Sequence, residues 1–539
     1  MDAFRLANKL LRSLTFWNAR RIWYLTRTQG PMAVLERARF AFGDRDSNAL
    51  RELEARPRAL ARQRRTPLAF QPRVGLAVAC IDTPLPHLQA LVASVGQQTY
   101  SNWRLSIAVR FSDENILDGL QELVRAYPQQ ITLTISKSHA RADLQSEAFA
   151  RAEGDFVGLL NANDVLLPNA LYELVARIGA DRAIDFVYGD EGVTDDAGVR
   201  RLGAILKPDF APDTLRGSNY IGHLALIRRD LWRSICGLDP TYQTASEYDL
   251  MLRASENAQS IAHVPKVILL QRAAPNAADT ATLADGQRAI AAHLERLKMP
   301  GRVESGLGET YRVHYELKSR PKVSIIIPNK DHASVLETGI ASIVTRSTYA
   351  NFEIVIVENN SALPATHEAY RRLQNDPRIR VIADNGPFNF SRLVNLGAKH
   401  ATGEFLLLLN NDTEVIAADW IERMLEFGQR DDVGAVGAKL LYPNQTTQHA
   451  GVIVGIQGLA GHIHRGLDPQ ESGYLGRLCT AQNLSAVTAA CMLIRKSIYD
   501  AHHGFDPAFA IAYNDVDFCL RLRAAGKLIV WTPDALLYH

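Results

Sequence analysis

Long apolar runs and cysteine are both scarce in this sequence. No uninterrupted apolar stretch approaches the roughly 20 residues that a membrane-spanning helix needs, and the first residues lack the apolar core and cleavage site of a signal peptide. The five cysteines lie far apart without a Cys-x-x-Cys pair, which argues against a zinc or dithiol motif. We therefore expect buried thiols in a reducing compartment and a cytoplasmic protein.

Phosphate-binding glycine loops are also missing, because no stretch has the spacing of a P-loop or of a dinucleotide fingerprint. The composition is otherwise that of an ordinary globular protein, with 47% hydrophobic and 22% charged residues. A chain of 539 residues is too long for one core and predicts two or three domains.

The net charge of +2 hides a basic N-terminal segment. Residues 1–65 hold 15 Lys and Arg against 6 Asp and Glu. Apolar residues from Phe4 to Trp17 follow helical spacing with basic residues between them. Two interpretations fit equally: a helix lying on an anionic membrane surface, or a helix docked on its own catalytic domain. Nucleic acid is not an expected partner.

From Arg73 onward, buried-strand patterns alternate with helical patterns, which predicts an α/β fold. The same order recurs from Val323 at a constant offset. Thr99-Tyr100-x-Asn102 matches Thr348-Tyr349-x-Asn351, and Gly154-Asp155-Phe156 matches Gly403-Glu404-Phe405, each pair 249 positions apart. This is an internal duplication. It predicts domains at 67–272 and 321–539, a basic helical segment at 1–66, and a connector at 273–320 with a helix over 283–297 and a short strand over 311–315.

The run from Glu404 to Leu409 predicts a strand buried on both faces of a parallel sheet, followed by Asn410, Asn411 and Asp412. Ligands of open α/β sheets bind beyond the carboxyl ends of the strands, so Asp412 is well placed to hold a cation. The 249-residue offset puts Asn163 at this position in the first half, where a neutral amide is a weaker ligand. Asp164 follows directly and is an alternative ligand if the turn is shifted.

Several stretches carry a resemblance to a known family. They include Val323–Asp331, Ile354–Ser361, Phe388–Ser391, Leu407–Val415, Gln448–Gly451 and Asn514–Arg521. The second half resembles a family 2 glycosyltransferase of the GT-A fold, of the tandem bacterial type associated with surface polysaccharide synthesis. The first half resembles the partner domain of the same proteins but has Asn161 and Asn163 where that pattern has aspartates. The resemblance therefore implies two tandem GT-A domains, the first of them degenerate.

The resemblance implies a role for each matching residue. Asp515 matches the catalytic base, and Asp412 and His539 match positions that bind Mg²⁺ or Mn²⁺. The positions expected to bind the donor are Pro328, Asn329, Glu358, Asn360, Asn410 and Asn411; those expected to be acceptor-side or structural are Asn514, Asp517 and Trp531; the first-domain counterparts are Asn163, Asp164 and Glu247. The family pattern usually continues past the terminal Tyr-His, so the chain is either naturally short or truncated.

Some of these residues also fit purely structural roles. Glu358 can cap the turn after its strand, and Asp517 and Arg521, four positions apart, can form a helical ion pair. Trp531 fits an acceptor platform or the core. His449, His462 and His464 lack the ligand spacing of a zinc site, so we interpret them as acceptor-loop or structural residues.

The leading expectation is an inverting, metal-dependent transfer of a sugar from a nucleoside-diphosphate donor to a glycan or lipid-linked glycan. A deoxyhexose or a hexose is expected from the family alone. The alternatives are a polymerising enzyme with both domains active, for which Asp164 and Glu247 leave room, and a non-catalytic glycan-binding scaffold. A nucleotidyltransferase is disfavoured, since no glycine-rich basic loop follows the first strand. The location expected is the cytoplasm, with attachment to the cytoplasmic face of the inner membrane under the first interpretation of residues 1–65.

Overall fold

The computed structural model describes residues 55–81, 83–110, 114–138, 140–198, 200–272 and 280–539. Most of the basic N-terminal segment lies outside these residues; its described end forms the short helix α4 (Pro57–Arg65). By its internal contacts the chain separates into two compact units. The first contains the described residues up to Phe210 together with Ile221–Ser246 and 257–272, and the second contains Ala211–Tyr220, Glu247–Glu256 and 280–539. The domain boundaries at 272 and 321 stay a prediction.

The first unit is built on a nine-stranded mixed sheet with the order β3-β2-β1-β4-β8-β6-β9-β5, and β7 pairs with β6. Strands β1 to β4 are parallel, whereas β8 is antiparallel to both β4 and β6. The strands are β1 (Val74–Ile81), β2 (Trp103–Arg110), β3 (Ile131–Ile135), β4 (Phe156–Asn161), β5 (Val165–Leu166), β6 (Phe186–Thr194), β7 (Arg201–Ile205), β8 (Ala225–Arg228) and β9 (Ile261–Arg272).

The second unit repeats the eight-strand order of this sheet and adds one strand, β21. Its ten-stranded sheet has the order β14-β13-β12-β15-β22-β17-β23-β16, with β18 beside β17 and β21 beside β23. The duplication expected from the sequence is thus a duplication of topology, and the α/β class is confirmed. The strands are β12 (Val323–Asn329), β13 (Phe352–Glu358), β14 (Ile379–Ala383), β15 (Phe405–Leu409), β16 (Glu414–Val415), β17 (Val433–Leu441), β18 (Thr447–His449), β21 (Gln482–Asn483), β22 (Cys491–Arg495) and β23 (Leu528–Tyr538); β19 (Val452–Val454) and β20 (Ala460–His462) form a separate hairpin.

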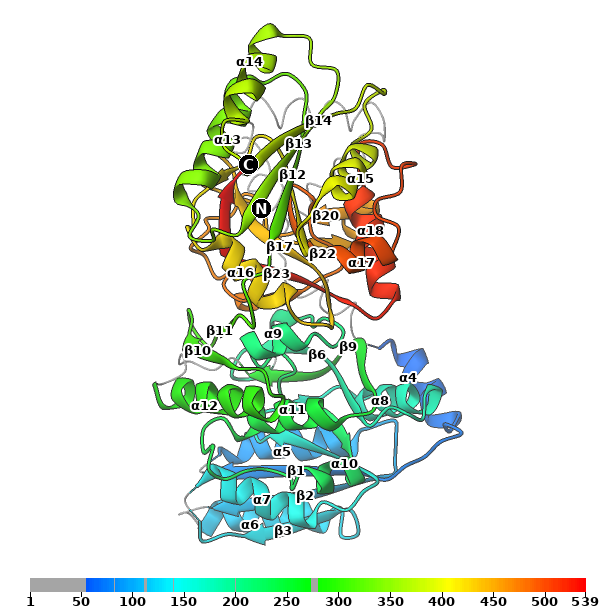
Figure 1. Ribbon diagram of the computed structural model, residues 1–539. Helices are drawn as coiled ribbons and strands as arrows, with labels where there is room; N and C mark the ends of the chain where they lie inside the picture. Colours follow the sequence, from blue (N-terminus) through cyan, green and yellow to red (C-terminus); the bar gives the residue numbers. More distant parts are fainter. Residues whose placement is uncertain (1–54, 82, 111–113, 139, 199, 273–279) are drawn as a thin grey trace, which may run out of the picture. The chain divides into compact units, whose positions relative to one another are not determined.

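Helices cover both faces of each sheet. In the second unit, α13 and α14 lie on one side of strands β12 to β14 and α15 lies on the other (Figure 1). The helices of the first unit are α5 (Leu85–Gly96), α6 (Glu114–Arg125), α7 (Arg141–Arg151), α8 (Ala170–Ala180) and α10 (Arg229–Ser234). Those of the second are α9 (Pro212–Gly217), most of α11 (Ser246–Asn257), α12 (Thr280–Arg296), α13 (Ala333–Arg346), α14 (Pro364–Leu373), α15 (Phe390–His400), α16 (Trp420–Gly428), α17 (Lys496–Ala501) and α18 (Asn514–Ala524).

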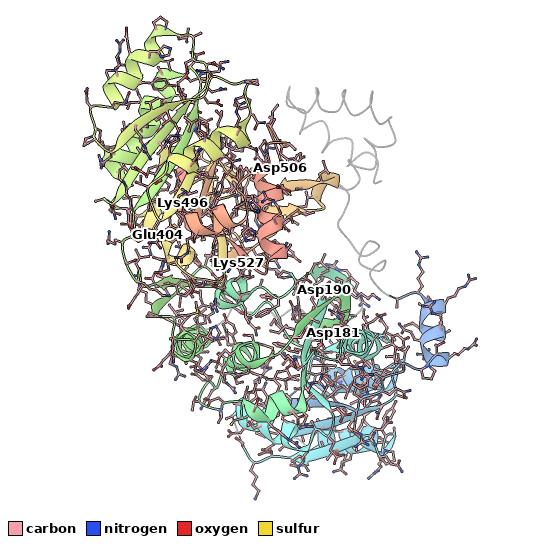
Figure 2. The ribbon with its side chains drawn as sticks, turned by 45° about the vertical axis from the view of Figure 1, so that its right-hand side comes forward. Asp181, Asp190, Glu404, Lys496, Asp506 and Lys527 are labelled. Atoms are coloured by element: carbon pink, nitrogen blue, oxygen red, sulfur yellow. The ribbon has the colours of Figure 1, made fainter. Side chains whose placement is uncertain are left out.

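Strand β15 is fully buried, as its unbroken apolar run predicts. Glycine at position 403 is required where the chain enters this strand, because a Cβ there would lie 2.6 Å from the carbonyl oxygen of Lys322. At the same end, the N–H of Lys496 donates to the carbonyl oxygen of Glu404 at 2.8 Å, which starts the antiparallel pairing of β15 with β22 (Figure 2). The entry of the chain into β15 is therefore held by a close backbone approach at Gly403 and by a hydrogen bond at Glu404.

The described part of the region expected as a connector, residues 280–320, contains a helix and two strands. Helix α12 and strand β11 (Tyr311–Tyr315) correspond to the helix and strand expected there. Strand β10 (Gly301–Ser305), which the sequence pattern did not reveal, pairs with β11 to form a hairpin. Both α12 and the hairpin belong to the second compact unit.

A buried charge cluster holds α9 within the second unit. The Asp213 carboxylate is 2.5 Å from Arg430 and 3.0 Å from Arg216, and it accepts a bond from the Asn483 amide at 2.7 Å. Burial alone would raise the pKa of Asp213, but the two guanidinium groups outweigh it and lower that pKa to about 2. The carboxylate is thus ionised and fully paired.

Replacing Asp213 by Asn would leave two buried guanidinium groups without their shared anion. We expect Asp213→Asn to lower the free energy of unfolding by about 3–5 kcal/mol, measured by urea denaturation of the full chain. Asp431→Asn, at a side chain that is 97% exposed, is the matched control and should change it little. Because the folded pKa is depressed, the stabilisation is present above about pH 4 and is lost as the pH falls toward 2. Equal stability of the two variants at pH 7 would contradict this role.

Candidate active site

Asp412 lies in the turn that follows β15, at the carboxyl end of the second sheet. Its side chain is 55% exposed, and Oδ1 is 3.3 Å from Nε2 of His539. When that imidazole is protonated, its hydrogen bond to Asp412 lowers the pKa of the carboxyl. The family resemblance predicts both residues at a metal site. The fold brings them together although they lie far apart in the chain.

His539 is held in place by hydrogen bonds on every side. Its backbone N–H donates to the carbonyl oxygen of Leu441 at 2.9 Å, its Nδ1 is 2.6 Å from Oε1 of Gln448, and its Nε2 is 2.9 Å from the amide nitrogen of Asn410. An amide oxygen can only accept, so Nδ1 carries a proton. In the neutral ring Nε2 therefore carries a lone pair, which accepts the Asn410 amide N–H; a metal bound at this atom would replace that hydrogen bond.

The donor set here fits a divalent cation shared with a ligand. Asp412 and His539 supply one carboxylate and one imidazole. Among the residues that the structure describes, no group of three or more His, Cys, Asp and Glu side chains could hold a metal ion alone. Mg²⁺ characteristically takes one or two protein ligands and fills its other positions with water and phosphate oxygens. The residues present thus suit a metal bound together with a diphosphate.

Asp515 lies at the start of α18 and lines a cavity of about 410 Å³. Its Oδ2 accepts from the N–H of Ala489 at 3.1 Å and its Oδ1 from the N–H of Val516 at 2.8 Å. Asn514 is buried, and its side-chain oxygen accepts the N–H of Asp515 at 2.8 Å. Tyr513, just before, has φ 64°, a left-handed conformation uncommon outside glycine. The carboxylate is thus held by backbone N–H groups from α18 and from the turn before β22.

One wall residue links the cavity to a candidate metal ligand, although neither Asp412 nor His539 lines the cavity itself. Asn410 lines it, and the same Asn410 amide contacts His539. The remaining walls come from five segments of the second unit: the lining residues are Phe390, Val452, Ala460, Gly461, His462, Thr488, Ala489, Ala490, Ile511, Ala512, Tyr513, Asn514 and Val516.

The residues expected to bind the donor lie at the ends of β12 and β13, and several have structural partners. Asn329 is buried, and its amide donates to the Tyr370 hydroxyl at 2.8 Å and to the Asp331 carbonyl at 2.9 Å. Pro328 is half-buried beside it. Glu358 accepts the N–H of Ser361, so it caps the turn after β13.

The other two amides of this group are also engaged. The Asn360 amide donates to the Gly386 carbonyl at 2.8 Å, from a backbone with φ 56°. The Asn411 amide donates to the side-chain oxygen of Asn329 at 2.6 Å. These hydrogen bonds connect the segments that follow the strands at this edge of the sheet.

Asp517 and Trp531, expected to be acceptor-side or structural, both make contacts within the fold. Asp517 pairs with Arg521 at 2.9 Å, four positions along α18. Trp531 has no exposed surface and lies in the core of the second unit. Its burial leaves no face of the ring for an acceptor sugar, so the platform role expected as one alternative is incorrect.

The first-half counterparts have different surroundings. Asp164 is only 1% exposed; it accepts the N–H of Asn161 at 2.9 Å and lies 2.8 Å from His223. Burial raises the pKa of Asp164 against the charge of His223. Asn163 contacts His87 at 3.0 Å. Glu247 falls in the second compact unit, whereas the other two belong to the first.

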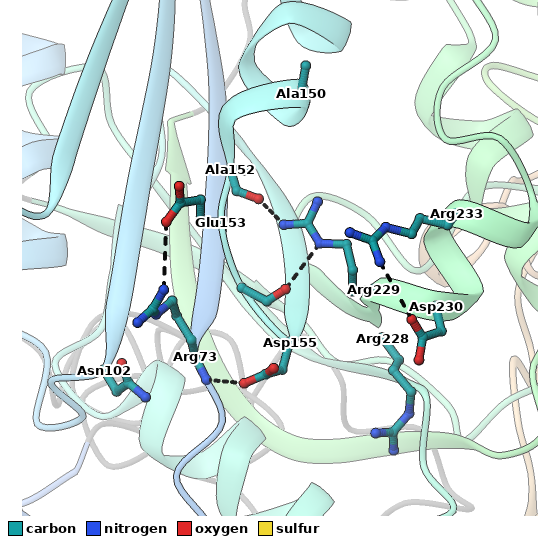
Figure 3. Close-up of a pocket in the computed structure, with 11 residues that line it drawn as sticks. Arg73, Asn102, Ala150, Ala152, Glu153, Asp155, Arg228, Arg229, Asp230 and Arg233 are labelled. Carbon is teal, nitrogen blue, oxygen red and sulfur yellow. Dashed lines mark hydrogen bonds and ion pairs between the residues drawn. The ribbon is translucent and has the colours of Figure 1, made fainter.

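A larger cavity, of about 760 Å³, lies in the first unit, at the amino-terminal ends of its parallel strands. Its wall includes Arg73, Asp155 and Arg229, next to the amino-terminal ends of β1 and β4 (Figure 3). These groups bond one another or the backbone: the N–H of Arg73 donates to Asp155 at 2.7 Å, and Arg229 donates to the Gly154 carbonyl at 3.1 Å. Catalytic groups of such sheets gather at the carboxyl ends of strands, so the smaller cavity of the second unit is the candidate site.

Sequence reasoning missed Gln448 and Phe390 as site residues. Gln448 orients His539, and Phe390 forms part of the cavity wall. Both stand inside stretches that carried the family resemblance, so the signal was present, but a role could be given only once β18 was placed beside β17.

Comparison with known proteins identifies the two halves. The family model described as "Glycosyl transferase family 2" matches residues 324–502, and the one described as "Glycosyltransferase like family 2" matches residues 72–289. The chain is a tandem pair of family 2 glycosyltransferase domains. The GT-A fold, the recognition of the family and the tandem arrangement expected from the sequence are thereby confirmed.

Two relatives are similar over most of this tandem glycosyltransferase. The O-antigen biosynthesis protein RfbC of Myxococcus xanthus is 36% identical over 481 residues, which cover 88% of this chain and 38% of that protein. The uncharacterized protein y4gI of Sinorhizobium fredii is 36% identical over 481 residues, covering 87% of this chain and 53% of that protein. The chain thus spans about half or less of the length of each relative. Within its described residues, none of the helices is both long and apolar enough to cross a membrane.

Gln448 offers a test of the metal site that leaves both candidate ligands intact. We expect Gln448→Leu to weaken Mn²⁺ binding by about 10- to 100-fold, because the imidazole of His539 loses the acceptor that fixes its tautomer. Electron paramagnetic resonance of free Mn²⁺, titrated in the presence of a nucleoside diphosphate, measures this. Gln470→Leu, at an exposed glutamine, is the control. Wild-type affinity in Gln448→Leu would remove the case for His539 as a ligand.

Proposed function

We propose that the second unit is an inverting, metal-dependent glycosyltransferase. It moves a sugar from a nucleoside-diphosphate donor to a hydroxyl group of a growing bacterial surface glycan, free or lipid-linked. The observation that supports this most is that Asn410 lines the same cavity as Asp515 while its amide contacts His539, which lies 3.3 Å from Asp412. The family gives the class of reaction, and the relative named for O-antigen biosynthesis supports a polysaccharide acceptor.

Asp515 would act as the base. As the acceptor oxygen bonds to the anomeric carbon, the bond from that carbon to the diphosphate breaks, and the acceptor proton passes to the carboxylate of Asp515. Attack on the face opposite the leaving group inverts the configuration at the anomeric carbon. The N–H groups of Ala489 and Val516 hold this carboxylate in place before the acceptor arrives.

Asp412 and His539 would hold the departing diphosphate beyond Asn410, which lines the cavity and contacts His539. Mg²⁺ or Mn²⁺ bound there would supply charge neutralisation for the leaving group. Asn410 positions His539, and Asn411 ties the same turn to β12 through Asn329. This turn is thus built to keep its two ligands in register with the strand ends where the nucleotide is expected.

The first unit is proposed to be non-catalytic. Asp164, its nearest candidate ligand, is turned inward to cap its own turn, and the amide oxygen of Asn161 accepts from Arg141. A guanidinium at this position opposes a bound cation. The first unit would then support the fold or bind glycan. Attachment to the cytoplasmic face of the inner membrane through residues 1–65 stays a prediction.

The assignment of the base can be tested by turnover. We expect Asp515→Asn to reduce release of nucleoside diphosphate by at least about 100-fold, since an amide cannot accept the proton. UDP-, GDP- and dTDP-sugars with Mn²⁺ and short p-nitrophenyl glycosides form the panel. Asp500→Asn, at an exposed carboxylate on α17, is the matched control and should retain activity. Full turnover by Asp515→Asn, or a product of retained anomeric configuration by NMR, would refute the mechanism.

A further inference from the structure

Two histidines meet at the wall of the active-site cavity. His449 ends β18 and His462 ends β20, and their Nδ1 atoms are 2.8 Å apart. The rings are nearly perpendicular, at 80°, with centroids 4.9 Å apart. His449 is completely buried, whereas His462 is exposed on the cavity side and lines it together with Asp515. The proposed mechanism uses neither of them.

The hydrogen bonds fix the proton on each ring. The N–H of Thr488 donates to Nε2 of His449 at 3.4 Å, so this nitrogen carries a lone pair. Burial, then the neighbouring His462 and His539, lower the pKa of His449 well below its ordinary value, so the ring is neutral and its proton is on Nδ1. That Nδ1–H donates to Nδ1 of His462. His462 therefore carries its own proton on Nε2.

The pair leaves one hydrogen-bond donor for a ligand. Among the described residues, Nε2–H of His462 has no partner. Partial desolvation lowers the pKa of His462, against the charge of Asp515, which raises it. A neutral ring suits an uncharged oxygen better than a phosphate. The pair is also no proton relay, because it ends at the N–H of Thr488, an amide that does not release its proton.

We propose that Nε2–H of His462 binds the acceptor sugar, donating to one of its oxygens so that a neighbouring hydroxyl faces Asp515. His449 is a positioning residue that fixes the tautomer of His462. This inference rests on the proposed function, since it gives the acceptor side of the same cavity a second contact. His462 is assigned to the acceptor side because it lines the same cavity as Asp515, the proposed base. The diphosphate is assigned instead to Asp412 and His539.

Steady-state kinetics separate this role from a structural one. His462→Phe removes the donor and should raise the KM for the acceptor about tenfold, the effect of one lost hydrogen bond, while the KM for the donor changes less than about twofold. His462→Gln, whose amide nitrogen can replace Nε2–H, should restore the acceptor KM to within about threefold. His449→Leu should raise the acceptor KM in the same direction. An unchanged acceptor KM in His462→Phe, or an equal rise in both KM values, would overturn the inference.

Nitrogen-15 NMR of histidine-labelled full-length protein tests the tautomers without turnover. We expect His449 to carry its proton on Nδ1 and His462 on Nε2, with signals assigned from the His449→Leu and His462→Phe variants. A proton on Nδ1 of His462 would overturn the inference alone. Failure of the wild type to turn over any donor of the panel would instead overturn the proposed function, and the acceptor role of His462 with it.

Discussion

The burial of β15 between two neighbouring strands is the constraint on which the site depends. Backbone hydrogen bonds fix its register against β12 on one side and β22 on the other. The turn that carries Asp412 is therefore placed by the sheet. The same strand end also positions the proposed base, because Asn410 donates its N–H to the Ala490 carbonyl and the neighbouring Ala489 donates to Asp515. Asp412, a candidate metal ligand, and Asp515, the proposed base, are thus both positioned from the carboxyl end of β15.

Much of this could be predicted from the sequence, because parallel strands and their crossover helices are local patterns. The apolar runs predicted β1, β2, β12, β13 and β15, and the 249-residue offset predicted that the two sheets would match. The position of Asp412 followed from the end of its strand.

What escaped prediction depends on pairings between distant segments. Gln448 reaches His539 only because β18 and β23 both pair with β17. Trp531 fitted two roles in sequence, and its burial, set by packing alone, decided between them. Likewise, no local signal indicated that Ala211–Tyr220 would join the second unit. The two units also show that one topology can carry different turns, so the fold alone does not give the site its chemistry.

The Asp213 cluster means that the duplicated halves are no longer interchangeable pieces. Helix α9 comes from the first half of the sequence, yet its carboxylate neutralises Arg430 within the second unit. A chain that began at residue 321 would keep the whole second sheet. Without α9, however, Arg430 would lose the Asp213 carboxylate that neutralises it. The second half of the sequence therefore does not contain every residue around which its own compact unit folds.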